Sequence, residues 1–233
     1  MFSKYIRVVP TAFCTFLFLT GCVSSPRITP AQLSDLQKKA EAGDRAAQLQ
    51  VGQAYDFGNA GQRNYAEAVR WYQLAADQGD ATAQNNLGSL YEHGLGAPTN
   101  YVKAAELYRK AADQGFALAQ NSLGRLYDFG WGVPTNYVEA NAWYLRAAEQ
   151  GDPQGMFNLG VNYGFGRGAE KDLVRAFMWL DLARFYTQMS SDMKTKWTVR
   201  RYLDDLKKLM TPAQIREGER MSAEWDRNHR KKN

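Results

Sequence analysis

The sequence repeats itself every 36 residues, and this period constrains the fold more than any other feature. Glycine recurs at this interval at Gly43, Gly79, Gly115 and Gly151, with no insertion between the copies. A fixed period of this length indicates stacked supersecondary units, each of which packs on its neighbours. The same register is kept at Gly52, Gly88, Gly124 and Gly160, at Tyr55, Tyr91, Tyr127 and Tyr163, and at Ala68, Ala104, Ala140 and Ala176.

Each unit is predicted to contain two helices joined by a turn. Ala47, Val51 and Tyr55 lie four residues apart, which places them on one face of the first helix. Short polar residues that cap helix N-termini precede both helices. They are Asp44, Asp80 and Asp152 before the first helix, and Asn64, Asn100, Asn136 and Asp172 before the second. Phe116 stands at the remaining cap position, so we expect that helix to begin without a cap, at a cost of ~1 kcal/mol.

The residues that the units share resemble the Sel-1-like repeat family, a member of the tetratricopeptide-like superfamily. The clearest are Gly79-Asp80, Leu87-Gly88, Gly94-Leu95-Gly96 and Ala111-Ala112-Asp113-Gln114-Gly115. The resemblance implies an all-α fold, a right-handed α-solenoid of helix-turn-helix repeats, with four repeats in residues 44–187. The fourth unit departs from the pattern at Leu173, Leu180 and Arg184, as a terminal repeat does when it meets something other than another repeat.

Helices are also predicted on both sides of the repeats, where they would cap the array. Residues 31–43 form the N-terminal capping helix, which begins at Thr29-Pro30. Residues 188–233 form the C-terminal capping helices and a basic tail. Met193, Trp197, Leu203 and Leu206 suggest the apolar side of one helix there, Ser191 is placed to cap it, and Thr211-Pro212 begins another.

The N-terminus resembles that of a bacterial lipoprotein. Lys4 and Arg7 precede a short apolar run, and Leu19-Thr20-Gly21-Cys22 follows it. Such a run is typical of a signal peptide, since a transmembrane helix needs about 20 apolar residues. The resemblance implies that residues 1–21 are removed, that Cys22 is lipidated and that residues 22–30 form a tether. Val23 after the cysteine favours the outer membrane, on its periplasmic face, and an ordinary secretory signal is the alternative.

Charge and cysteine content exclude several functions. The net charge of +5 falls to +3 without Lys4 and Arg7, which is too little to indicate nucleic-acid binding. Residues 192–233 hold twelve Lys or Arg against seven Asp or Glu, and Arg230-Lys231-Lys232 close the chain as a short basic tail. This tail is either solvated or in contact with anionic lipid or an acidic partner. With Cys14 removed and Cys22 acylated, no disulfide is possible, unlike in the cysteine-rich branch of the family.

No pattern in the sequence indicates catalysis, a metal or a cofactor, so the chain is predicted not to be an enzyme. Ser191 and Lys194 match a Ser-x-x-Lys motif without its usual companions, and His93 and His229 are the two histidines. Asp56, Glu92 and Asp128 recur at one position, which indicates a role on the helix surface or in the turn.

A protein-binding surface is expected on the face of the first helices that varies between units. In tetratricopeptide-like superhelices these helices line the concave surface, where peptides bind, although a merely solvated face is equally compatible with the pattern. Arg125 would hold a carboxylate bidentately, and the amides would bond a peptide backbone. The candidate residues are Asn85, Asn86, Ser89, His93, Asn121, Ser122, Arg125 and Asp128.

These features together predict a lipid-anchored, non-catalytic adaptor in the periplasm that binds another protein or peptide of the cell envelope. The alternative is a cell-wall enzyme, hydrolase or β-lactamase-like, or a direct inhibitor of one. An enzyme would need a cleft with an acid–base pair, and an inhibitor would need a protruding loop. The gapless repeats offer no long insertion for either.

Overall fold

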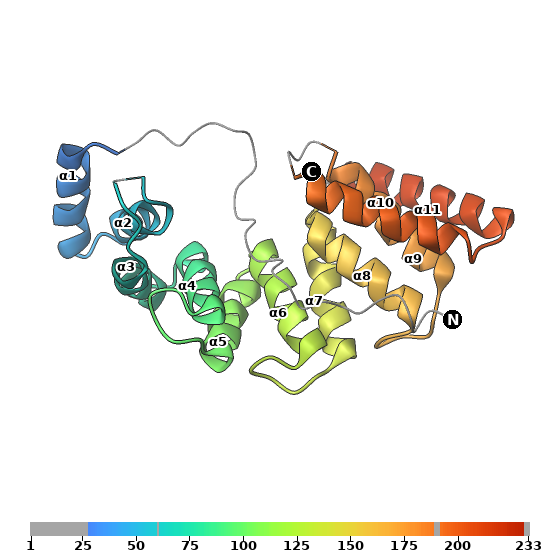
Figure 1. The fold of residues 1–233 in the computed structure, drawn as a ribbon, viewed down its shortest axis with the longest axis horizontal. Helices are drawn as coiled ribbons and strands as arrows, with labels where there is room; N and C mark the ends of the chain where they lie inside the picture. The colour runs from blue at the N-terminus through green and yellow to red at the C-terminus, as the bar shows by residue number, and fades with distance from the viewer. Residues whose placement is uncertain (1–27, 60, 189–191, 231–233) are drawn as a thin grey trace.

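A computed structural model describes residues 28–59, 61–188 and 192–230 of the 233-residue chain. Within these ranges eleven helices follow one another and no strand occurs, so this part of the chain is an all-α solenoid. The helices stack in an arc whose two ends, α1 and the α10–α11 pair, rise on the same side (Figure 1). They are α1 (Pro30–Glu41), α2 (Arg45–Phe57), α3 (Tyr65–Asp77), α4 (Ala81–His93), α5 (Tyr101–Asp113), α6 (Ala117–Phe129), α7 (Tyr137–Glu149), α8 (Pro153–Phe165), α9 (Leu173–Tyr186), α10 (Met193–Lys207) and α11 (Pro212–Arg230).

The helix boundaries follow the capping residues that the sequence predicts. Asp80, for example, accepts a hydrogen bond from the backbone N–H of Ala83 at 2.9 Å and begins α4. Asn100 does the same for Lys103 at 3.0 Å and begins α5. Phe116 makes no side-chain cap bond, as expected. Each repeat is therefore an even-numbered first helix and an odd-numbered second helix, from α2–α3 to α8–α9.

Glycine in the turn is required by the approach of neighbouring units. Gly132 follows α6 with a φ of 71°, a left-handed conformation that favours glycine. A Cβ at this position would lie 2.3 Å from the backbone carbonyl of Tyr101, the first residue of α5. The turn of one unit thus rests directly on the second helix of the unit before it. Position 60, where the first unit departs from this pattern, lies outside the described residues.

Within each of the first three units the two helices meet where a tyrosine ring packs on a glycine. A Cβ added to Gly124 on α6 would meet ring atoms of Tyr144 on α7 at 2.8 Å. Gly88 and Tyr108 form the same contact in the preceding unit, where the distance would be 3.1 Å. Both rings are almost completely buried. Glycine costs a helix about 1 kcal/mol relative to alanine, and the burial of an aromatic ring offsets that cost.

Glutamine side chains link successive units at a second level of the core. Gln84 on α4 donates its amide to the carbonyl of Ala76, at the end of the preceding unit, at 3.2 Å. Its own oxygen accepts a hydrogen bond from Gln114 at 2.8 Å. Gln48 and Gln120 repeat this arrangement with Gln78 and Gln150.

The fourth unit ends the array because its residues at these positions differ. Met156 and Tyr186 replace the two glutamines, and both belong to the apolar cluster that α8 and α9 share with the C-terminal helices. The Tyr186 hydroxyl donates to Asp226 on α11 at 3.2 Å, and its ring contacts Trp225. The departure of this unit from the repeat pattern is therefore explained by the helices α10 and α11, which pack on α9.

Two details of α10 differ from the sequence-based expectation. Its apolar side consists of Val199, Leu203 and Leu206, which are buried, whereas Met193 and Trp197 are 71% and 61% exposed and face away from the core. The prediction that the latter two lie on the buried side is wrong. They lie on the opposite side of the helix from Thr195 and Val199, which are buried.

The start of α10 also lies one residue beyond the predicted cap. Asp192 caps the helix by accepting the N–H of Lys194 at 3.0 Å, and Ser191 lies outside the described residues. At the other predicted starts, Thr29 caps α1 and exchanges hydrogen bonds with Gln32, and Thr211 does so with Gln214. No helix in the described ranges is both long enough and apolar enough to cross a bilayer.

The stacking of the units predicts where the protein is least tolerant of a cavity. Leu123 on α6 is completely buried in the middle of the array. We expect Leu123→Ala to lower the free energy of unfolding by about 2–5 kcal/mol, measured by urea denaturation. Hydrogen exchange should show the terminal repeats opening before the central ones, because they have fewer neighbours. Central repeats that exchange fastest would contradict this account.

Candidate protein-binding surface

The polar residues proposed from the sequence do not form a free surface. Asn85 and Asn86 on α4 are each 3% exposed, and the amide of Asn85 donates to Asn86 at 3.3 Å. Both asparagines, which were expected to bind a peptide backbone, are therefore buried within the array. Ser89, His93 and Ser122 are partly buried.

The carboxylates that recur on the first helices accept hydrogen bonds from the buried tyrosines. The hydroxyl of Tyr108 on α5 donates to Glu92 on α4 at 2.8 Å. Tyr72 and Tyr144 donate in the same way to Asp56 and Asp128, at 3.0 Å and 3.4 Å. The carboxylate satisfies the tyrosine hydroxyl one helical turn beyond the glycine on which the ring packs. The predicted surface or turn role of these carboxylates is corrected to one in packing within the unit.

Burial of the two tyrosine–aspartate pairs changes the pKa of both members. Burial raises the pKa of Asp56 and Asp128 above the ordinary range of an aspartate, and the tyrosine hydrogen bonds partly oppose this. Burial, and then the charge of the neighbouring carboxylate, raises the pKa of Tyr72 and Tyr144. The tyrosines therefore remain protonated donors.

Arg125 is bound inside the array. Its guanidinium lies 2.7 Å and 2.8 Å from the two carboxylate oxygens of Glu92, one unit earlier. The side chain of Glu92 is 3% exposed and that of Arg125 is 19% exposed, so this ion pair is mostly shielded from water. The guanidinium also lies over the ring of Trp131, 5.7 Å from its centre. Arg125 would have to leave Glu92 in order to hold a partner's carboxylate bidentately.

One further candidate residue links neighbouring units, and another makes a contact within its own helix. Asn121 on α6 accepts a hydrogen bond from Asn158 on α8 at 2.9 Å. Nδ1 of His93 lies 2.7 Å from the carbonyl oxygen of Ser89, within its own helix. Cys22, the predicted lipidation site, lies outside the described residues. The predicted site is thus mainly a network of contacts within and between the repeats.

A different set of side chains is exposed beside the turns. Tyr101 and Trp131 stack with ring centres 5.5 Å apart, and Phe129 and Trp131 stack at 4.9 Å. We call the set the aromatic strip. It comprises Tyr101, Phe129 and Trp131, and their equivalents one repeat later, Tyr137, Phe165 and Arg167.

The aromatic strip crosses the boundaries between units. Arg167 stands where the previous unit has Trp131, and its guanidinium lies over Phe165 at 5.1 Å and over Tyr137 at 5.7 Å. The four Tyr and Phe side chains of the strip are each 36–39% exposed. The rings meet because Gly132 and Gly168 bring each turn onto the preceding helix. The strip is therefore held in place by the stacking of the repeats.

Tyrosine, tryptophan and arginine are the residues that carry most of the energy in protein interfaces. The aromatic strip places them at exposed or partly exposed positions where a partner would contact two units at once. None of the residues of the aromatic strip is among the candidates proposed from the sequence. They could have been found from the aromatic residues that flank each Gly-rich turn at a period of 36.

The ion pair leads to a prediction about stability. Arg125→Ala leaves the buried carboxylate of Glu92 without its cation, so the free energy of unfolding should fall by about 3 kcal/mol in urea denaturation. Adding Glu92→Gln to Arg125→Ala removes the unpaired charge and should restore part of this loss. If Arg125→Ala unfolds at the same urea concentration as the parent, the arginine is a free surface group and the network described above is wrong.

The Sel1 repeat family model matches four consecutive segments of the chain, residues 45–80, 81–116, 117–152 and 153–184. Each segment contains one pair of helices, from α2–α3 to α8–α9. Proteins built from Sel1 repeats act as protein-interaction scaffolds and are generally not enzymes. Among curated protein sequences, none matches this chain.

Two crystal structures have a similar fold and at least 30% identity. One is c5321, a protective antigen present in uropathogenic Escherichia coli strains that displays an SLR fold. It is 34% identical with a TM-score of 0.75, and the alignment covers 83% of this chain but 40% of that one, so this chain spans less than half of its length. The other, a Sel1 repeat protein from Oxalobacter formigenes, is 30% identical with a TM-score of 0.67 over 82% of this chain and 76% of that one. From its four matched repeats and their helical pairs, the chain belongs to the Sel1 repeat family.

Proposed function

We propose that this protein is a non-catalytic scaffold that binds another envelope protein while a lipid on Cys22 holds it at the periplasmic face of the outer membrane. The observation that carries the binding role is the aromatic strip. Its tyrosine and phenylalanine rings are exposed, Trp131 is partly buried, and the stacking of the repeats fixes all of them, so a partner could contact them without first ordering a loop.

The packing of the polar residues favours binding over catalysis. Glu92 forms an ion pair with Arg125, and Asp128 accepts a hydrogen bond from Tyr144. Both interactions are part of the packing of the repeats. A catalytic acid–base pair needs access to a substrate. No long insertion interrupts the repeats to make a lid or an inhibitory loop.

The proposed location depends on the N-terminal segment, which lies outside the described residues up to position 27. Leu19-Thr20-Gly21-Cys22 supports lipidation, and Val23 supports the outer membrane. Seven extended residues between Cys22 and Pro30 would reach about 25 Å, at roughly 3.3–3.6 Å each. The solenoid would therefore stay close to the membrane surface.

The binding role is tested with a partner captured by crosslinking from an envelope extract. Replacing Tyr101, Phe129 and Trp131 with alanine removes stacked anchors, and we expect the captured partner to bind at least about 2 kcal/mol more weakly by calorimetry. Val102 and Val138 are more exposed than these rings but make no ring contact. Their replacement by alanine is the matched control and should leave affinity unchanged.

Thermal melting separates loss of binding from loss of folding in both variants. Equal affinity for the parent and the triple alanine variant would remove the aromatic strip as the binding surface. The basic tail would then be the next surface to test.

The anchor is tested separately by mass spectrometry. The protein extracted from membranes should begin at an acylated Cys22, and Cys22→Ala should appear in the soluble fraction or retain its signal peptide. Recovery of an unmodified mature chain from the soluble fraction would contradict lipidation.

A further inference from the structure

The fourth repeat lacks the tyrosine–carboxylate pair that the other three contain. At the two positions of that pair stand Gly164, in place of the carboxylate, and Leu180, in place of the tyrosine. Both members of the pair are therefore shortened in the same unit. The space that a tyrosine hydroxyl and a carboxylate occupy elsewhere is left open between α8 and α9.

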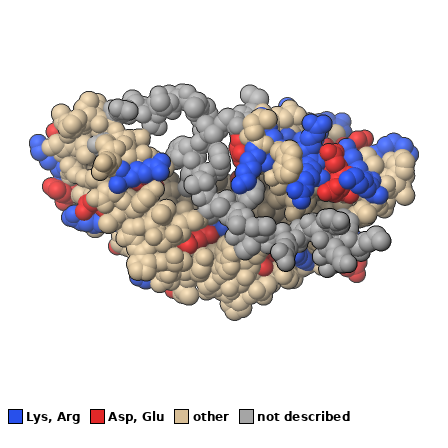
Figure 2. Space-filling view, viewed as in Figure 1, with Lys and Arg blue, Asp and Glu red and all other residues tan. Residues whose placement is uncertain are grey.

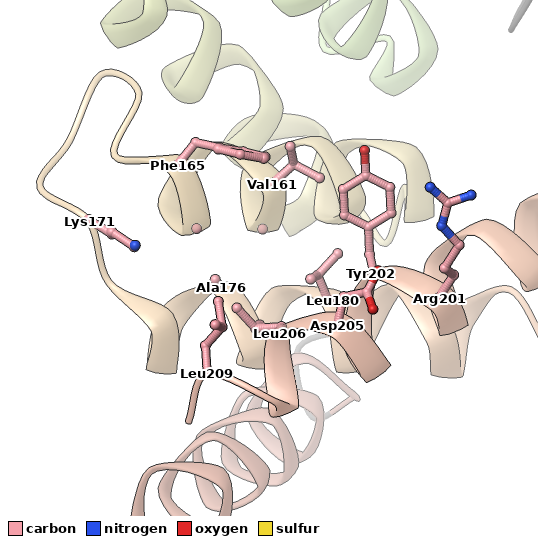
Figure 3. A pocket seen from close by; sticks show the side chains of 12 residues that line it. Val161, Phe165, Lys171, Ala176, Leu180, Arg201, Tyr202, Asp205, Leu206 and Leu209 are labelled. Carbon is pink, nitrogen blue, oxygen red and sulfur yellow. The ribbon is translucent and has the colours of Figure 1, made fainter. Parts of the chain in front are cut away.

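An apolar pocket of about 120 Å³ lies at this place, where α10 covers the side of the unit (Figure 3). Gly160 and Gly164 form part of its wall, and neither has a side chain that would narrow it. Its apolar lining comes from three helices. The residues are Val161 and Phe165 on α8, Ala176 and Leu180 on α9, Leu206 on α10, and Leu209 in the turn that follows α10.

The size of the pocket suits one side chain. An apolar cavity of about 150 Å³ holds a benzene molecule, so the smaller pocket here would take a group such as the side chain of leucine. A long acyl chain would extend beyond it. Since hydrocarbon forms most of the wall, the group that binds there does not have to be polar.

Two cationic side chains border the pocket on different sides. Lys171 comes from the turn before α9 and points toward the opening, and Arg201 comes from α10 (Figure 3). Asp205 also borders it, but its carboxylate is paired with Lys208 at 2.7 Å. Lys and Arg side chains gather over α10 and α11 on the face shown in Figure 2. The surroundings therefore favour a ligand with negative charge beside its apolar group.

The pocket also continues the aromatic strip. Phe165 lines the pocket and belongs to the strip, where Arg167 lies over its ring. A peptide that contacts the strip could therefore place a side chain in the pocket without leaving the surface of the protein.

We propose that this pocket binds one leucine-sized side chain of a protein partner, within a segment that carries acidic residues on both sides of it. This inference rests on the proposed scaffold function and assigns the fourth repeat and α10 as the site that selects the partner's sequence. The loss of the tyrosine–carboxylate pair creates the pocket, and Lys171 with Arg201 favours the acidic flanks.

The probe is a fluorescein-labelled peptide with one leucine between two pairs of glutamates, titrated with the full chain in detergent and followed by anisotropy. We expect saturable binding that becomes about tenfold weaker when alanine replaces the leucine. Glutamines in place of the glutamates should weaken it as well. Binding of the acidic peptide should weaken as salt is added.

The protein variant that fills the pocket carries the residue types found at the same two positions in the other repeats. Gly164→Asp with Leu180→Tyr rebuilds the pair that three units already contain, so we expect the variant to fold, as checked by thermal melting. It should bind the leucine peptide about tenfold more weakly than the parent. Lys171→Gln with Arg201→Gln changes the pocket's charge without filling it, so it remains informative if the first variant does not fold. It should bind the glutamate peptide more weakly and leave the glutamine peptide unchanged.

Equal binding of the leucine and alanine peptides, or no effect of either double variant, would overturn the inference. So would binding to phosphatidylglycerol vesicles that the filled variant abolishes, because the pocket would then serve a lipid. If the filled variant binds the captured partner normally while the triple alanine variant of the strip does not, the pocket inference fails and the scaffold function stands. If a partner binds regardless of both surfaces, the proposed binding surface itself is wrong.

Discussion

The packing of a tyrosine ring on a helical glycine is the contact on which the rest of the structure depends. Because Gly124 has no side chain, the ring of Tyr144 reaches the backbone of α6 and its hydroxyl reaches Asp128. This sets the distance between the two helices of a unit. The turn glycines then set the distance between units, since Gly132 rests on the backbone of Tyr101. The close fit at these contacts fixes the positions of the helices and of successive units relative to one another.

This construction determines which side chains remain for binding. The polar groups on the first helices are used within and between units: Glu92 is bonded to Tyr108 of its own unit and to Arg125 of the next. The aromatic residues beside the turns remain exposed, and the stacking of the repeats fixes them. The fourth unit has Gly164 and Leu180 in place of the tyrosine–carboxylate pair of the other units, and an apolar pocket lies there instead. The same contact thus explains both the stability of the repeats and the proposed site where they end.

The sequence predicted the helices and their caps well because these depend on local residues. Asp80, Asn100 and the uncapped start at Phe116 are examples. The candidate site was predicted poorly because its contacts join different units. Arg125 and Glu92 are 33 residues apart. A pair of this kind varies from unit to unit and resembles a free surface when the repeats are aligned. The pocket could not be predicted in this way, because α10 forms part of its wall and the repeat pattern does not give the position of that helix.

The central role of the glycine–tyrosine contact is tested most directly by comparing two alanine substitutions in helices. Helix propensity alone predicts that Gly124→Ala and Gly164→Ala both raise the free energy of unfolding by about 1 kcal/mol. The new Cβ would lie 2.8 Å from the ring of Tyr144 in the first case, and 3.6 Å from Ala176 in the second. Our account therefore predicts that urea denaturation gives a loss of about 1–3 kcal/mol for Gly124→Ala and no loss for Gly164→Ala. Equal stabilisation of both variants would contradict it.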